Sequence, residues 1–199
     1  MTASAILLIT SWGCALADAL VAGRRSFPRR AALTSIMCSI TGAFLLAQLA
    51  HPQLLPDFER DAQKILQGQW WRVLTALLFQ DGGLIGGLTN ISGLLLIGRQ
   101  AEQSLRRRDC VIVYLVGAVF AELVALRWQP IGAGNSIGVC SLAGAMVVLQ
   151  RSGLRKRANF ALKSAVIASA ALLIALRDIH GIALIAGGVL AVIVSWGNL

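Results

Sequence analysis

The sequence predicts an all-α polytopic membrane protein. Its 199 residues are 57% hydrophobic and only 14% are charged, whereas soluble domains carry about 25% charged residues. Several apolar runs approach the ~20 residues that a helix needs to cross a hydrocarbon core of about 30 Å. A backbone in lipid must satisfy its hydrogen bonds internally, and the sequence lacks the alternating segments typical of a membrane barrel. We therefore expect spanning helices.

Seven apolar segments predict seven transmembrane helices. The first, residues 3–22, contains Asp18 and has no basic residues ahead of it, so we expect a retained helix rather than a cleaved signal peptide. Residues 51–82, which separate the second segment from the third, are too polar to span a membrane, yet they are rich in Trp, Leu and Phe. The later segments cover residues 31–50, 83–98, 110–127, 131–150, 160–176 and 178–197.

The net charge of +9 indicates a membrane topology rather than a nucleic-acid site. Lys and Arg form short clusters between apolar segments, and the clusters occupy alternate loops. Because cytoplasmic loops are enriched in these residues, residues 51–82 and the N-terminus are predicted to lie outside a cell membrane, and the C-terminus in the cytoplasm. The clusters are Arg24, Arg25, Arg29 and Arg30; Arg99, Arg106, Arg107 and Arg108; and Arg151, Arg155, Lys156, Arg157 and Lys163.

The four cysteines are predicted to be packing residues. Cys14, Cys38, Cys110 and Cys140 stand singly in or beside apolar segments, without the C-x-x-C spacing of metal or redox sites. We therefore expect neither a disulfide framework nor a metal ion.

Three polar residues are predicted to lie at similar depth in the membrane. The third, fifth and seventh segments all run inward, and Asn90, Ser136 and His180 lie about seven, five and two residues into them. At 1.5 Å per residue, each lies within roughly 10 Å of the outer boundary. The three side chains are thus able to converge.

The chemistry of these residues suggests a nucleophile and its base. An ionisable residue inside a membrane helix is by default a functional hypothesis, and a neutral imidazole within hydrogen-bond reach can activate a serine. His180 would then serve as base for Ser136, and Asn90 or backbone N–H groups would stabilise an oxyanion.

Each residue also has a structural interpretation. Ser136 lies in "GAGNSIGVCSLAGA", where small residues favour close helix packing, and His180 is also placed to face interfacial water beside Asp178. Ser141 and Cys140 are alternative nucleophiles in the same stretch, but they lie deeper and farther from water.

Four stretches, in order, resemble the rhomboid family of intramembrane serine proteases: "GQWWRVLTALLF", "LTNISGLLLIGRQAE", "GNSIGVCSLAGA" and "HGIALIAGG". The resemblance implies a rhomboid-like six-helix core over residues 31–199, in which residues 51–82 form an external membrane-associated loop. Residues 1–30 would add an extra N-terminal transmembrane helix and a basic cytoplasmic loop.

The resemblance also implies roles for single residues. Ser136 would be the nucleophile and His180 the general base of a dyad without an acid, with Asn90 helping to hold the oxyanion. No metal or organic cofactor is implied, and the substrates would be single-span or polytopic membrane proteins within the lipid bilayer. The implied structural residues are Trp70, Trp71 and Arg72, which anchor the external loop at the interface, the motif residues Glu102 and Gly134, and the packing glycines Gly144 and Gly187.

Four positions depart from the family pattern. Ile137 follows the serine where a glycine is usual, and Gly86 replaces a histidine that often helps to bind the oxyanion. Gln80 replaces a second frequent histidine, and Cys140 stands where some members carry a tyrosine. Since losing one oxyanion donor can lower a rate by about 10²–10³, weak or narrowly specific activity is a second expectation.

Two other functions remain open on the sequence alone. A catalytically weak or inactive rhomboid-like protein would bind membrane-helix clients without cleaving them. A small transporter or channel would use Asp18, Glu122 and His180 as a proton path. Acids inside a membrane are costly, so Asp18 and Glu122 are each expected to pair with a polar group across a helix interface or to face a water-filled region.

Overall fold

Seven long helices dominate the computed structural model, which describes residues 3–21, 31–149 and 156–196. Each coincides with one predicted apolar segment, and the all-α polytopic membrane class is confirmed. By length and composition, three of the described helices, α2, α7 and α10, are long and apolar enough to cross a membrane. The seven are α1 (Ala3–Val21), α2 (Ala32–Ala50), α6 (Gly83–Ser104), α7 (Arg107–Trp128), α8 (Ser136–Leu149), α9 (Lys156–Ala175) and α10 (Ile179–Trp196).

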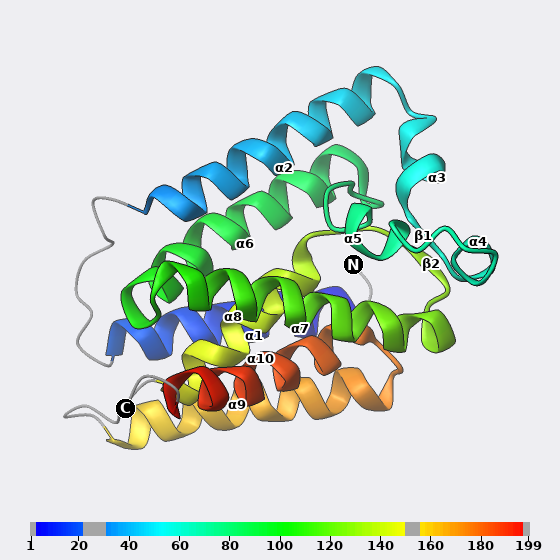
Figure 1. The fold of residues 1–199 in the computed structure, drawn as a ribbon. Helices are drawn as coiled ribbons and strands as arrows, with labels where there is room; N and C mark the ends of the chain where they lie inside the picture. Colours follow the sequence, from blue (N-terminus) through cyan, green and yellow to red (C-terminus); the bar gives the residue numbers. More distant parts are fainter. Residues whose placement is uncertain (1–2, 22–30, 150–155, 197–199) are drawn as a thin grey trace.

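Helix α8 occupies the centre of the bundle. It packs against α10, α6, α7 and α1, and every residue from Ser136 to Val147 is buried. Figure 1 shows this helix passing between its neighbours with one end beneath the short elements of the connection formed by residues 51–82. Because lipid tails supply no hydrophobic driving force between helices, close van der Waals contact must hold such a bundle together.

Glycines bring α8 and α10 into close contact. A methyl group added to Gly144 would overlap the backbone carbonyl of Leu184, and one added to Gly187 would overlap the carbonyl of Ser141. The two backbones therefore touch on both sides of the interface. This pair also carries Ser136 and His180, so the same packing sets the distance between them.

Residues 51–82 form a compact set of short elements at one end of the bundle (Figure 1). The strand β1 pairs antiparallel with β2, with Arg60 opposite Gly132. This pairing ties the connection to the chain just before α8. The elements are α3 (Leu54–Phe58), β1 (Arg60–Asp61), α4 (Ala62–Leu66), α5 (Arg72–Thr75) and, after α7, β2 (Ile131–Gly132).

The fifth helix begins later than its apolar segment predicts. The sequence placed Ser136 about five residues inside a segment that starts at residue 131, whereas the structure makes Ser136 the first residue of α8. The reason is that Ile131 and Gly132 pair with β1, and the N–H of Gly134 donates to the carbonyl of Ala76 at 2.9 Å. The backbone groups of these residues make hydrogen bonds with the connection, so they are not available for helical hydrogen bonds.

Arg72 holds the connection together from within. Its side chain is only 4% exposed, and the guanidinium donates to the carbonyls of Pro56 and Glu59 and to Gln69 Oε1. Arg72, which was expected to anchor the loop at the membrane interface, therefore joins parts of the connection to one another. It donates hydrogen bonds to carbonyls that have no partner within the short helices. Trp70 and Trp71, in contrast, are 58% and 52% exposed.

Two buried carboxylates link distant elements. Glu122 in α7 pairs with Arg60 of the connection, with 2.5 Å between Oε2 and Nη1, and both side chains are almost fully buried. Glu102 in α6 accepts the backbone N–H and the hydroxyl of Thr34 in the first turn of α2, where a negative charge favours the free N–H groups of a helix. Glu122 thus has the polar partner expected of it.

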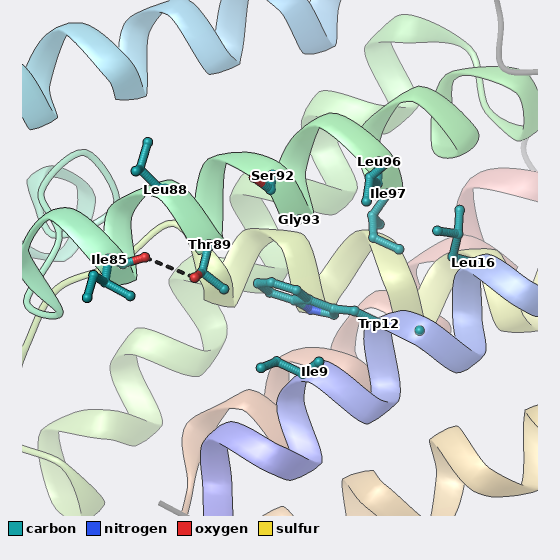
Figure 2. A pocket seen from close by; sticks show the side chains of 11 residues that line it. Ile9, Trp12, Leu16, Ile85, Leu88, Thr89, Ser92, Gly93, Leu96 and Ile97 are labelled. Carbon is teal, nitrogen blue, oxygen red and sulfur yellow. Dashed lines mark hydrogen bonds between the residues drawn. The ribbon is translucent and has the colours of Figure 1, made fainter. Parts of the chain in front are cut away.

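Helix α1 packs against α9, α8 and α6. The Trp12 ring lies against Gly93 of α6, and its Nε1 donates to Cys140 Sγ of α8 at 3.4 Å. Trp12 lines an apolar groove of about 520 Å³, and Figure 2 shows its ring extending from α1 toward α6. The Asp18 side chain and the basic residues 24–30, 151 and 155 lie outside the described part of the chain.

Candidate active site

The N-terminus of α8 places Ser136 in a polarised environment. The first N–H groups of an α-helix have no partner within the helix and carry its partial positive charge. Ser136 contributes the first of these groups, and Ile137 and Gly138 contribute the next two. Ser136 therefore lies at the positive end of α8, which suits a developing negative charge.

Ser136 and His180 are hydrogen-bonded across the α8–α10 interface. The distance between Ser136 Oγ and His180 Nε2 is 2.9 Å. His180 is the second residue of α10, and its imidazole remains 20% exposed, whereas Ser136 is 7% exposed. A serine hydroxyl thus meets an imidazole that solvent can reach, which is the geometry of an activated nucleophile and its base.

An acid that the sequence analysis did not assign completes a chain of hydrogen bonds. Asp178 Oδ1 lies 2.5 Å from His180 Nδ1 and also accepts the backbone N–H of His180 at 3.0 Å. The Asp178 side chain is 5% exposed. Where a serine–histidine dyad without an acid was expected, the structure shows serine, histidine and aspartate in series.

Asn90 approaches the serine from α6, held by a short network of amides. Its Nδ2 donates to Gln80 Oε1 at 2.8 Å, and the Gln80 backbone exchanges two hydrogen bonds with the Gln48 side chain of α2. Gln80, at the position of a frequent family histidine, is fully buried. The amide of this glutamine thus orients Asn90.

Gly134 lies next to both Ser136 and Asn90. A Cβ atom at Gly134 would stand 3.2 Å from Ser136 Oγ and 3.5 Å from Asn90 Nδ2. The serine and the asparagine therefore face the same small space, which glycine leaves open. Asn90, Ser136 and His180, separated along the sequence, come together as their predicted depths suggested.

A cavity of about 300 Å³ opens beside Ser136 and His180. Arg60 and Asp81 of the connection contribute to its wall, together with Gln129 and Ile137. Ile137 is 3% exposed, so the branched side chain that replaces the family glycine shapes the wall of this cavity. The cavity gives the serine a polar approach from the side of the connection.

The two alternative nucleophiles are bonded elsewhere. Ser141 donates its hydroxyl proton to the carbonyl of Val113 at 2.7 Å, and the Cys140 thiol accepts from Trp12. Both residues are fully buried. They contribute to helix packing and to the attachment of α1.

Several residues predicted from the sequence stabilise the elements around the site. Glu102 caps α2, Arg72 clasps the connection, and Gly144 and Gly187 set the α8–α10 distance. Sequence reasoning missed Asp178 and the pairing of Gln80 with Asn90. An aspartate just ahead of a helix is a recognisable N-cap pattern, and that signal places Asp178 beside His180.

Comparisons with known proteins identify one family. The family model of the Rhomboid domain matches residues 67–198, which is more than half of the chain. The match includes the helices that carry Asn90, Ser136 and His180. No curated protein and no solved structure is significantly similar to this sequence.

Proposed function

Because the chain belongs to the rhomboid family, we propose that it is an intramembrane serine endopeptidase that cleaves the transmembrane helices of membrane-protein substrates. The observation that carries the proposal is the 2.9 Å hydrogen bond between Ser136 Oγ and His180 Nε2. The family as a whole is protease-like, and this pair gives the chain the two groups that such chemistry requires.

Acylation begins with proton transfer from Ser136 to His180 Nε2. The serine oxygen forms a bond to the substrate carbonyl carbon, and the carbonyl electron pair moves to its oxygen. When the tetrahedral intermediate collapses, the C–N bond breaks and His180 gives its proton to the leaving amine. A water molecule then repeats the sequence on the acyl-enzyme, which frees the new carboxyl group and restores the serine proton.

Backbone and side-chain donors stabilise the oxyanion. The Ser136 N–H lies at the positive end of α8, and the Asn90 amide faces the same space from α6. Donors of this kind act without reorganisation because the fold already holds them in place. In this chain Gln80, rather than a histidine, fixes the orientation of the asparagine.

The substrate is a membrane helix whose end can unwind. A peptide bond inside a helix is shielded, and its carbonyl already accepts a hydrogen bond, so cleavage needs a locally extended segment. Water reaches the dyad from the outer side through the cavity beneath the connection. We propose that the chain is a multi-pass protein of the cell membrane, with its N-terminus outside and its C-terminus in the cytoplasm. In this proposal residues 31–199 form the core, and residues 1–30 are an extra unit that precedes it.

Cleavage assays in liposomes test this function directly. A panel of single-span substrates is incubated with the wild type, Ser136→Ala and His180→Ala. Both variants are expected to yield no product, and a fluorophosphonate probe is expected to label only chains that retain Ser136. Ser141→Ala is the matched control, because it removes a serine of the same helix whose hydroxyl donates to the carbonyl of Val113. Equal product from the wild type and both dyad variants would refute the proposal.

A second candidate is a rhomboid-like protein that binds membrane helices without cleaving them. The observation that favours it is Ile137, whose buried side chain borders the serine where the family has glycine. This candidate predicts that the wild type and Ser136→Ala capture the same client helices, with no product and no fluorophosphonate labelling from either.

A further inference from the structure

We infer that Asp178 is a positioning residue that acts through His180, so that the proposed protease uses a Ser136–His180–Asp178 chain rather than a dyad. The inference rests on the proposed function. Its basis is the series of two side-chain hydrogen bonds, 2.9 Å from Ser136 Oγ to His180 Nε2 and 2.5 Å from His180 Nδ1 to Asp178 Oδ1.

The first consequence concerns the tautomer of His180. A carboxylate only accepts hydrogen bonds, so Asp178 requires the proton of the neutral imidazole to lie on Nδ1. The unprotonated Nε2 then faces the serine hydroxyl and is ready to accept its proton. Without the aspartate, either nitrogen could carry the proton, and the ring could also rotate about its side-chain bonds.

The second consequence concerns charge. When His180 accepts the serine proton, the resulting imidazolium lies next to the buried carboxylate of Asp178. Of the charged groups near this site, Glu122 of α7 is paired with Arg60, and Asp81 lines the cavity from the connection. Asp178 is the carboxylate that contacts the ring, so it stabilises the charge formed during acylation.

A simpler role for Asp178 is to cap α10. It directly precedes the first helical residue, Ile179, and accepts the N–H of His180, as an N-cap residue does. Capping alone needs only the backbone contact, however. Here the same oxygen also bonds the imidazole, and the side chain is almost completely buried. The two roles predict different outcomes on substitution.

Two substitutions separate capping from positioning. Asparagine and serine cap helices about as well as aspartate, so Asp178→Asn and Asp178→Ser should preserve α10. Both remove the negative charge next to the imidazole, so kcat is expected to fall by about 10²–10⁴. KM and the thermal midpoint in detergent are expected to stay near their wild-type values, and the rate of fluorophosphonate labelling is expected to fall with kcat.

Asp61→Asn is the matched control. Asp61 caps α4 through the N–H groups of Gln63 and Lys64 and contacts no histidine in the described part of the chain. This substitution is expected to leave kcat unchanged. Wild-type kcat in both Asp178→Asn and Asp178→Ser would overturn the inference and leave Asp178 as a cap. Absence of cleavage by the wild type itself would instead contradict the proposed function.

A second measurement, made on the wild type, tests the inference even if both Asp178 variants unfold. Nitrogen chemical shifts of the imidazole in the folded wild type report which ring nitrogen is protonated. The sequence has two histidines, His51 and His180, so His51→Asn assigns the signals. We expect the neutral ring of His180 to carry its proton on Nδ1. A neutral ring protonated on Nε2 would overturn the inference without any activity measurement.

Discussion

At the scale of single residues, the candidate site depends on a position that has no side chain. Gly134 lies between the serine and the asparagine, and a methyl group there would stand 3.2 Å from Ser136 Oγ. A contact this short requires the neighbouring atom to move by a few tenths of an ångström, and a misplacement of about 1 Å at a reacting group can lower a rate by 10²-fold. Glycine therefore keeps the reacting space open.

Gly134→Ala is expected to lower kcat by about 10–100-fold without unfolding the protein, because the added methyl displaces the serine or the Asn90 amide. The measurement is steady-state cleavage together with the rate of fluorophosphonate labelling. Gly42→Ala is the control, since a methyl group added there meets no atom within 4 Å. Equal losses in both variants would mean that the crowding at Gly134 has no specific effect.

Asn90→Ala is expected to lower kcat by about 10²–10³ while KM changes little, as is typical when one oxyanion donor is lost. Gln80→Ala is expected to have a smaller effect in the same direction, because it frees Asn90 without removing its amide. A rate in Asn90→Ala equal to that of the wild type would leave the backbone N–H groups as the sole oxyanion donors.

Glu59 provides a prediction that depends on pH. Burial raises the pKa of its carboxyl group above the ordinary value of 4.5, Asp81 raises it further, and Lys64 and Arg72 act in the opposite direction. An acid with a raised pKa in the folded state destabilises that state once the group ionises. Glu59→Gln removes this penalty, so its thermal midpoint relative to the wild type is expected to increase between pH 4 and pH 7. A difference in thermal midpoint between Glu59→Gln and the wild type that stays constant from pH 4 to pH 7 would contradict this prediction.

The residue types of the site could be predicted from the sequence, but their partners could not. Ser136, His180 and Asn90 stand at comparable positions in segments that were predicted to run inward, and the structure brings them together. The bonds of Asp178 and Gln80 depend on side-chain directions at helix ends, and apolar periodicity carries no information about these.

At the scale of elements, one helix pair fixes the geometry of the site. The backbones of α8 and α10 touch at Gly144 and Gly187, and these helices carry the serine and the histidine. Separation of the helices would lengthen the hydrogen bond between the two side chains.

Gly144→Val and Gly187→Val are therefore expected to lower the thermal midpoint and to abolish fluorophosphonate labelling together, because the added side chains overlap backbone carbonyls of the facing helix. Backbone atoms give way less readily than flexible side chains. Gly13→Val in α1 is the control, since a methyl group there meets no atom within 4 Å. Wild-type stability in both variants would show that the helices do not pack this closely.

The sequence predicted the existence of the seven helices but not all of their boundaries, since α6 continues to Ser104, past the predicted end at residue 98, and α8 begins only at Ser136. Apolar composition marks residues 131–150 as a unit, yet residues 131–132 pair with a strand about 70 residues earlier. Such a pairing is a long-range contact that the local pattern does not encode. The helix begins where backbone pairing with the connection ends, and that point is Ser136.

At the scale of the whole molecule, the connection formed by residues 51–82 is joined to the bundle by a buried ion pair. Arg60 contacts Glu122 of α7 and also pairs through its backbone with β2. Removing one member of a buried pair leaves an uncompensated charge, which typically costs about 3–5 kcal/mol.

Glu122→Gln is expected to lower the thermal midpoint strongly and to reduce cleavage, because the same arginine also donates to β2, which lies just before α8. The double variant Arg60→Met/Glu122→Leu is expected to recover most of the stability, since apolar residues can replace a buried ion pair. A double variant less stable than Glu122→Gln would show that the charges themselves hold the connection in place.

The position of α1 constrains the order in which the molecule can assemble. This helix precedes its neighbours α6, α8 and α9 in the sequence, and the contact between Trp12 and Cys140 spans 128 residues. Contacts so distant along the chain form late because much of the intervening chain must first be in place. We therefore expect α1 to complete its contacts only after α9 has been made, so that its place beside the serine-bearing helix is among the last parts of the bundle to form.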